Sequence, residues 1–287
     1  MRHAILCLAL ILVGGSAQAQ DFEKTLKGLR DQFTAPAPES AKPESASPSI
    51  PTFGDVPEAD EIKLGQQIAG NLLDAAPLVE DPALQRYVNR VGRWVASQSE
   101  RPGLPWTFGV IDSNDVNAFA APGGYIFITK GLYKLLRDEA ELAGVLAHEV
   151  AHVVRAHHLK LIQQGQLISA GAGLLKQMLG GADERLQKLI GSGAEIVARS
   201  LDKTAEFEAD RMGVVLATRA GYDSFGLPSV LQAIGHLSVD SGAVALLFKT
   251  HPHPDERLAK LGEAMCNRFD AITDGRSLPE RLQKIPS

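Results

Sequence analysis

Cysteine is scarce in this 287-residue chain, which contains only two, and basic residues are not in excess. The 29 lysine and arginine residues are outnumbered by 34 aspartate and glutamate residues, which gives a net charge of −5. Nucleic-acid-binding proteins need a basic surface, so no nucleic-acid partner is expected. No internal repeat is evident, so a helical-repeat domain is not expected either. The composition, 45% hydrophobic and 22% charged, is typical of a globular protein with one sizeable core.

A long, purely apolar segment is also lacking. Residues 4–13 form an apolar run behind a basic N-terminus, and Ala17-Gln18-Ala19 supplies the small residues of a cleavage site. This pattern predicts a signal peptide over 1–19, whose apolar run is too short to span a bilayer comfortably. The apolar stretch at 161–179 contains glutamine and lysine, so we expect no transmembrane span in the mature chain.

Export predicts a location in a bacterial periplasm, either in solution or peripheral to the outer membrane. Cleavage after Ala19 removes Cys7 and leaves Cys266, which then cannot form an internal disulfide. An exported protein without disulfides needs another source of stability, and a bound metal ion would provide one.

Three parts are predicted after the signal peptide. Residues 20–56 begin with an amphipathic segment and continue as a linker rich in proline and serine. The amphipathic segment can pack on the body of the protein, on a partner or on a membrane surface. Residues 57–268 are expected to form a compact domain, and 269–287 a C-terminal tail. The apolar stripe of the amphipathic segment consists of Phe22, Leu26, Leu29 and Phe33.

The compact domain is predicted to be α+β and mainly helical. Apolar residues at helical spacing predict helices over 58–73 and 82–99, the second capped by Asp81. β-Branched and aromatic residues predict strands over 106–111 and 125–129. A further helix is expected to begin at Asp138, because acidic side chains favour the positive end of the helix dipole.

That further helix carries the sequence His148-Glu149-Val150-Ala151-His152 in an apolar run. Residues four apart share one helix face, so His148 and His152 can bind one metal ion. The Glu149 carboxylate can reach a water on the metal, which is the arrangement of zinc peptidases. Two core histidines are the alternative, but unpartnered polar groups are costly to bury. The pattern therefore predicts one Zn²⁺ per chain.

A catalytic zinc needs a third protein ligand, and the sequence offers two candidates. His158 has the spacing of the metzincin class, but that class needs a glycine where this chain has Arg155. If the helix continues, His158 lies about 9 Å along the axis from His152 and cannot bind the same ion. His157 and His158 are then expected to be exposed or packed polar residues.

The second candidate is Glu206, which is followed one helical turn later by Asp210. If Glu206 binds zinc, Asp210 can accept a hydrogen bond from a ligand histidine and fix its orientation. Glu208 points elsewhere and is expected to be solvated. On spacing alone, a surface cluster of charges remains the alternative for this stretch.

Taken together, these residues resemble the gluzincin metallopeptidases of the HtpX/BepA type, which are related to the CAAX prenyl protease. The similarity covers 57–261 and includes Asn117-x-Phe119-x-x-Pro122-Gly123-Gly124-x-Ile126 before the zinc helix. It implies a zincin-like fold with a small sheet beside the His-Glu-x-x-His helix, and it implies Glu206 as third ligand. The chain is most similar to soluble periplasmic members, but it lacks the helical-repeat domain of BepA.

The resemblance also suggests roles for two further segments. The strand Gly124-Tyr125-Ile126-Phe127 is predicted to form the edge of the substrate cleft, where an extended peptide adds as a strand. An ordinary internal strand is the alternative. His251, in Thr250-His251-Pro252, matches a histidine that can occupy the open zinc position, so we expect either self-inhibition or a role in the transition state. A simple turn is the alternative. Arg211 is a further candidate for the second electrophile.

The predicted function is that of a zinc endopeptidase that cleaves misfolded or unassembled envelope proteins, with Glu149 as the general base. Its partners would be unfolded polypeptides and the outer-membrane assembly machinery. The alternative is a periplasmic chaperone or assembly factor with a latent zinc site.

Overall fold

The computed structural model describes residues 56–163, 201–237 and, with short gaps, 244–285. The chain divides into the units Met1–Thr52 and Phe53–Ser287, and every described residue belongs to the second. The predicted signal peptide and amphipathic segment lie outside the described residues. Among the described helices, none combines the length and apolar character needed to cross a bilayer.

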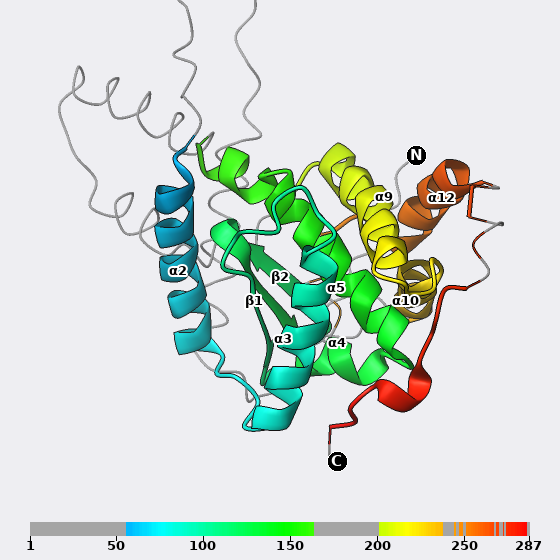
Figure 1. Cartoon of the computed structure of the whole chain (residues 1–287), viewed down its shortest axis with the longest axis horizontal. Coiled ribbons are helices and arrows are strands. Elements are labelled where there is room, and N and C mark those ends of the chain that lie inside the picture. Colours follow the sequence, from blue (N-terminus) through cyan, green and yellow to red (C-terminus); the bar gives the residue numbers. More distant parts are fainter. Residues whose placement is uncertain are drawn as a thin grey trace, which may run out of the picture. The chain divides into compact units, whose positions relative to one another are not determined.

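The sheet has three strands in the order β1-β3-β2. Strand β1 (Thr107–Ile111) runs parallel to β3 (Tyr125–Thr129), whereas β2 (Ala118–Ala121) runs antiparallel to it (Figure 1). The turn η1 (Pro122–Gly124) joins β2 to β3. The expectation of a mainly helical domain with a small sheet is confirmed.

The strand predicted to form the edge of the substrate cleft lies instead at the centre of the sheet. β3 pairs with β1 on one side and with β2 on the other, so no edge is open at Tyr125–Phe127, and Gly124 belongs to η1. The run Ile126-Phe127-Ile128 is buried throughout, as central strands are. The strand missed from the sequence is β2, because its Ala-Phe-Ala-Ala sequence has a weak strand signal.

Two helices precede the sheet in the chain, α2 (Glu58–Ala75) and α3 (Pro82–Ala96). The Asp81 carboxylate caps α3 by accepting hydrogen bonds from the backbone N–H groups of Ala83 and Leu84 at 2.9 and 3.0 Å. α3 packs on β1 through one buried stripe, and the short helix α4 (Lys130–Leu135) follows β3. The stripe consists of Leu84, Val88, Val91 and Val95.

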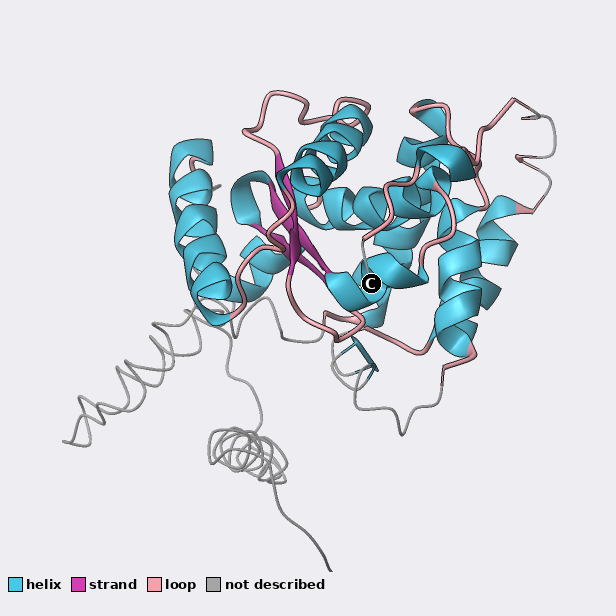
Figure 2. Ribbon diagram, turned by 90° about the horizontal axis from the view of Figure 1, so that it is seen from below, coloured by secondary structure: helices cyan, strands magenta, loops and turns pink. Residues whose placement is uncertain are grey.

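Helix α5 (Glu139–Val154) is the central element of the domain, and every residue from Glu139 to Val153 is buried. As predicted, it begins after Asp138, whose carboxylate accepts from the Glu141 N–H at 2.8 Å. α9 (Lys203–Arg219), α10 (Gly226–Gly235) and β2 all pack against it. Figure 2 shows, from a second direction, the strands with helices on both sides of them.

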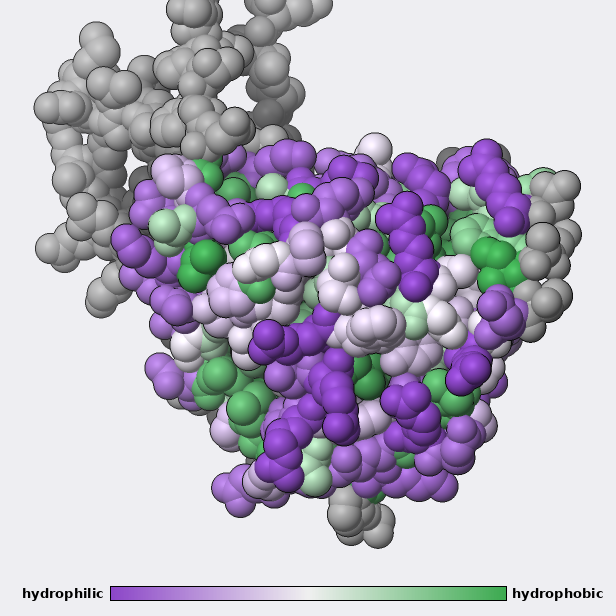
Figure 3. Space-filling model, viewed as in Figure 1, coloured by the Kyte–Doolittle hydropathy of each residue, from purple (hydrophilic) through white to green (hydrophobic). Residues whose placement is uncertain are grey.

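The last helix, α12 (Pro254–Met265), packs on α9 and α10, and the chain then continues to the turn η2 (Pro279–Arg281). On the face seen in Figure 3, hydrophilic residues predominate and hydrophobic ones form small scattered patches. The main hydrophobic core of the described part includes α5 and the elements that pack on it.

A buried carboxylate joins three segments to the start of α5. Glu139 is fully buried, and its Oε2 accepts from the Tyr87 hydroxyl at 2.9 Å. Its Oε1 accepts from the Tyr222 hydroxyl at 3.0 Å and pairs with the Arg281 guanidinium at 3.0 Å. Burial and this carboxylate raise the pKa of Tyr87, so the phenol keeps its proton and remains a donor. Glu139 thus connects α3, the loop after α9 and the η2 turn to α5.

Candidate metal centre

The two histidines of the His-Glu-x-x-His sequence converge on one face of α5, as the spacing predicts. The Nε2 atoms of His148 and His152 lie 3.0 Å apart. Their exposed fractions are 4% and 0%, and burial lowers the pKa of His152 well below its usual value. A neutral imidazole with a free nitrogen lone pair is the form that binds metal ions.

Glu206 reaches the same point from α9. Its Oε1 lies 3.5 Å from His152 Nε2, and its Oε2 lies 3.7 Å from His148 Nε2. α9 begins just before it, capped by Asp202, whose carboxylate accepts from the Ala205 N–H at 2.9 Å. α9 runs close to α5, since a Cβ on Gly213 would lie 3.0 Å from the backbone nitrogen of His148.

His251 completes a group of four potential ligands. Its Nδ1 lies 2.7 Å from Glu206 Oε2, and one ligand atom from each of the four residues lies within 4.8 Å of the others. Burial alone would lower the pKa of His251, but the adjacent Glu206 carboxylate raises it. Burial would raise the pKa of Glu206, but the neighbouring His251, His152 and Arg257 lower it instead.

The donor atoms of this group fit a zinc ion. A tetrahedral zinc with Zn–N bonds of about 2.0–2.1 Å holds two imidazole nitrogens about 3.3 Å apart, close to the observed separation. In the described part of the chain, Glu206 Oε1 is one of two buried side-chain atoms without a hydrogen-bond partner. This oxygen faces His152 Nε2 at 3.5 Å, and a metal ion bound between the two atoms would satisfy it, because a buried acceptor without a partner is costly.

Glu149 lies next to His148 on α5 and is buried. Burial raises the pKa of Glu149, against the opposing influence of His148 and His251. A carboxylate of raised pKa is a better proton acceptor, which suits a general base.

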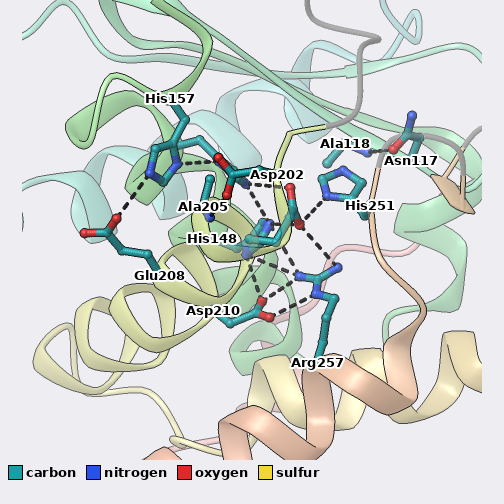
Figure 4. Close-up of polar contacts among 12 residues, drawn as sticks. Asn117, Ala118, His148, His157, Asp202, Ala205, Glu208, Asp210, His251 and Arg257 are labelled. Carbon is teal, nitrogen blue, oxygen red and sulfur yellow. Dashed lines mark hydrogen bonds and ion pairs between the residues drawn. The ribbon is translucent and has the colours of Figure 1, made fainter. Parts of the chain in front are cut away.

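Each imidazole of the pair has its own partner on the side away from the cluster. For His148 this partner is Asp210, whose Oδ1 lies 3.0 Å from His148 Nδ1. Arg257, on α12, forms a two-pronged ion pair with the same carboxylate at 2.6 and 2.9 Å (Figure 4). Burial would raise the pKa of Asp210, but the guanidinium lowers it.

The sequence did not indicate Arg257, and Arg211, the candidate for the second electrophile, is exposed on α9. Arg257 is nearly fully buried at 5% exposure. It lies 51 positions after Glu206 in a helix whose other charged residues are solvated. No local pattern distinguishes it from an ordinary surface arginine, so only the fold identifies it.

His158 lies closer to His152 than a continuous helix would place it. α5 ends at Val154, and Ala156 adopts a left-handed conformation with φ of 55°. After this turn the His157 and His158 rings lie against that of His152, at centroid distances of 5.1 and 5.6 Å. His158 is nevertheless outside the group of converging donors. Burial lowers the pKa of His158 to about 4.

Comparison with known proteins agrees with this geometry. Over 206 residues, 69% of this chain and 42% of the relative, the chain is 30% identical to the beta-barrel assembly-enhancing protease of Escherichia coli (strain K12). It is 28% identical over 177 residues to the mitochondrial metalloendopeptidase OMA1 of Schizosaccharomyces pombe, covering 62% of this chain and 52% of that one. It is also 29% identical over 166 residues to the metalloprotease YcaL of Escherichia coli (strain K12), covering 58% of this chain and 64% of that one.

The chain spans about two fifths of the length of the assembly-enhancing protease that it matches. The match to a protein family covers more than half of this chain. Residues 82–265, from the start of α3 to the end of α12, match the sequence model of the family described as Peptidase family M48. The resemblance inferred from the sequence is therefore confirmed, and the chain belongs to peptidase family M48.

Proposed function

We propose that the chain is a zinc-dependent endopeptidase that hydrolyses peptide bonds in misfolded or unassembled envelope proteins, outer-membrane proteins among them. The observation that carries this proposal is the convergence of His148, His152 and Glu206 on one buried point, with Glu149 beside it. The names of relatives as metallopeptidases support the activity. The name of the beta-barrel assembly-enhancing protease supports proteins that assemble as β-barrels as the substrate class.

In this proposal His148, His152 and Glu206 hold the metal. Zinc bound there supplies a Lewis acid that polarises the scissile carbonyl and acidifies water. The Glu149 carboxylate accepts a proton from the attacking water and later donates it to the nitrogen of the leaving amine. Asp210, fixed by Arg257, holds the His148 ring with Nδ1 outward and Nε2 toward the metal.

A substrate strand cannot add to β3, so we assign this role to β2. β2 is an edge strand in the described sheet, and it packs directly on α5. Asn117 precedes β2, and its buried Nδ2 has no hydrogen-bond acceptor among the described residues. In this proposal, substrate binding uncovers this donor, which is fully buried in the structure, so that it can donate to a substrate carbonyl. Replacing Asn117 by leucine should raise KM more than it lowers kcat; an unchanged KM would remove this assignment.

His251 supports a second candidate function. A site with four protein ligands is typical of structural zinc, whereas a catalytic zinc keeps one position open. With His251 on the metal, the protein would be latent, and a chaperone or assembly role would not need hydrolysis. We propose that His251 is displaced by substrate, so that it inhibits the enzyme at rest.

Casein digestion by purified protein separates the two candidates. Glu149→Gln should retain zinc and lose cleavage, and equal cleavage by this variant and the wild type would overturn the endopeptidase proposal. His251→Ala should raise basal cleavage if the histidine inhibits. Unchanged or lower cleavage by His251→Ala would argue against inhibition while leaving the endopeptidase proposal intact.

A further inference from the structure

The left-handed turn after α5 gives His152 a partner that the sequence analysis did not foresee. The Ala156 N–H donates to Val153 O at 3.0 Å, and a turn at residues 155–156 interrupts the helix at this point. The His157 ring then lies edge-on to that of His152 at an interplanar angle of 70°. The two Nδ1 atoms are 2.9 Å apart, and His157 is 7% exposed.

Only one distribution of protons satisfies these contacts with a metal present. His152 Nε2 faces His148 and Glu206 and must offer its lone pair to the ion, so its Nδ1 carries the proton and donates. His157 Nδ1 must then accept. A neutral ring that accepts at Nδ1 carries its proton at Nε2, which lies 3.4 Å from the Glu208 carboxylate.

Glu208 is itself held in place. Its Oε1 pairs with Arg155 Nε at 3.0 Å, while its Oε2 faces His157. Arg155 is the C-cap of α5, so the residue that ends the helix also anchors the last carboxylate. Glu208 is 41% exposed, so it is not a buried charge that the core requires.

We infer that His157 is a positioning residue for the metal ligand His152, through a hydrogen-bond relay that runs from His152 to His157 and ends at Glu208. The inference rests on the metal site of the proposed function and deepens it. His148 is held directly by a carboxylate, Asp210, whereas His152 is held by a carboxylate acting through an imidazole. Both ligand rings are thereby fixed with Nε2 toward the ion.

The test measures zinc affinity of the full chain, by competition with a chromogenic chelator at neutral pH. His157→Leu removes the acceptor and should weaken zinc binding about 10–100-fold, the usual cost of losing such a partner. His157→Asn places an amide oxygen near the position of Nδ1 and should bind within about threefold of wild type. His158→Leu is the matched control and should bind zinc within about threefold of wild type, because it removes a neighbouring imidazole buried to a similar extent but outside the relay.

Wild-type affinity in His157→Leu, or equal losses in the leucine and asparagine variants, would overturn the relay. If His157→Leu does not fold, Glu208→Ala carries the test, since the replaced side chain is partly exposed. It should weaken zinc binding about threefold or more, with unchanged unfolding of the metal-free protein. Wild-type affinity in Glu208→Ala would contradict the inference. A wild-type chain that binds no zinc would instead contradict the proposed function, so the two failures are distinguishable.

Discussion

Replacing Arg257 by methionine should destabilise the metal-free protein severely, although the residue is far from the substrate-binding elements in sequence. The Arg257 and Asp210 side chains are 6% and 2% exposed and are joined by contacts of 2.6 and 2.9 Å. Methionine has a similar length and fills most of the space, so the loss arises chiefly from the charge left on Asp210. Removing one partner of a buried ion pair costs about 3–5 kcal/mol.

The double variant Arg257→Met, Asp210→Asn isolates this effect. The asparagine carries no charge, and its side-chain oxygen can still accept from His148 Nδ1, so most of the lost stability should return. The assay is urea unfolding of chelator-treated protein followed by circular dichroism. A loss of less than about 1 kcal/mol in the single variant, or a double variant less stable than the single one, would refute the proposed role of this ion pair.

Three further predictions concern the turn, the metal and the buried carboxylate. Ala156→Gly should leave the free energy of unfolding unchanged or raise it by about 0.5 kcal/mol, since glycine relieves the left-handed strain. Ala156→Val should lower the thermal unfolding midpoint, and a valine variant more stable than the glycine variant would contradict the left-handed turn. Removing zinc that is present at roughly a thousand times its Kd should lower the free energy of unfolding by about 4 kcal/mol, and Glu149→Gln should show the same loss. An unfolding midpoint that does not change when chelator is added, measured by calorimetry, would refute a metal site in the folded state. Tyr87→Phe should lower the free energy of unfolding by about 1–3 kcal/mol, because it removes the hydroxyl that donates to Glu139 Oε2. Tyr222→Phe should lower it less, because Glu139 Oε1 still pairs with Arg281 in that variant; equal unfolding midpoints of the two variants would count against this.

Much of the site could be predicted from the sequence because its chemistry is local. His148 and His152 are four residues apart on one helix, and Glu206 and Asp210 repeat that spacing on another. The helix periodicity places each pair on one face. The structure brings both pairs and His251 together, with Glu149 buried next to them.

The remaining features depend on contacts between distant segments. Nothing near Arg257 in the sequence indicates that it meets Asp210, 47 positions away. Strand β3 is apolar enough for either an edge or a centre, and its place was decided by β2, whose alanines give little strand signal. The end of α5 was missed because alanine is a good helix former and rarely turns a chain.

The turn at Ala156 also bears on how related sequences are searched. A search that demands glycine after the second histidine would treat this chain as having an uninterrupted helix and would discard the two histidines that follow. Here alanine adopts the left-handed conformation, one position after Arg155, where the metzincin pattern has its glycine. Sequences with a small residue at either position, followed by histidine, therefore merit inspection for an imidazole that contacts the second metal-binding histidine.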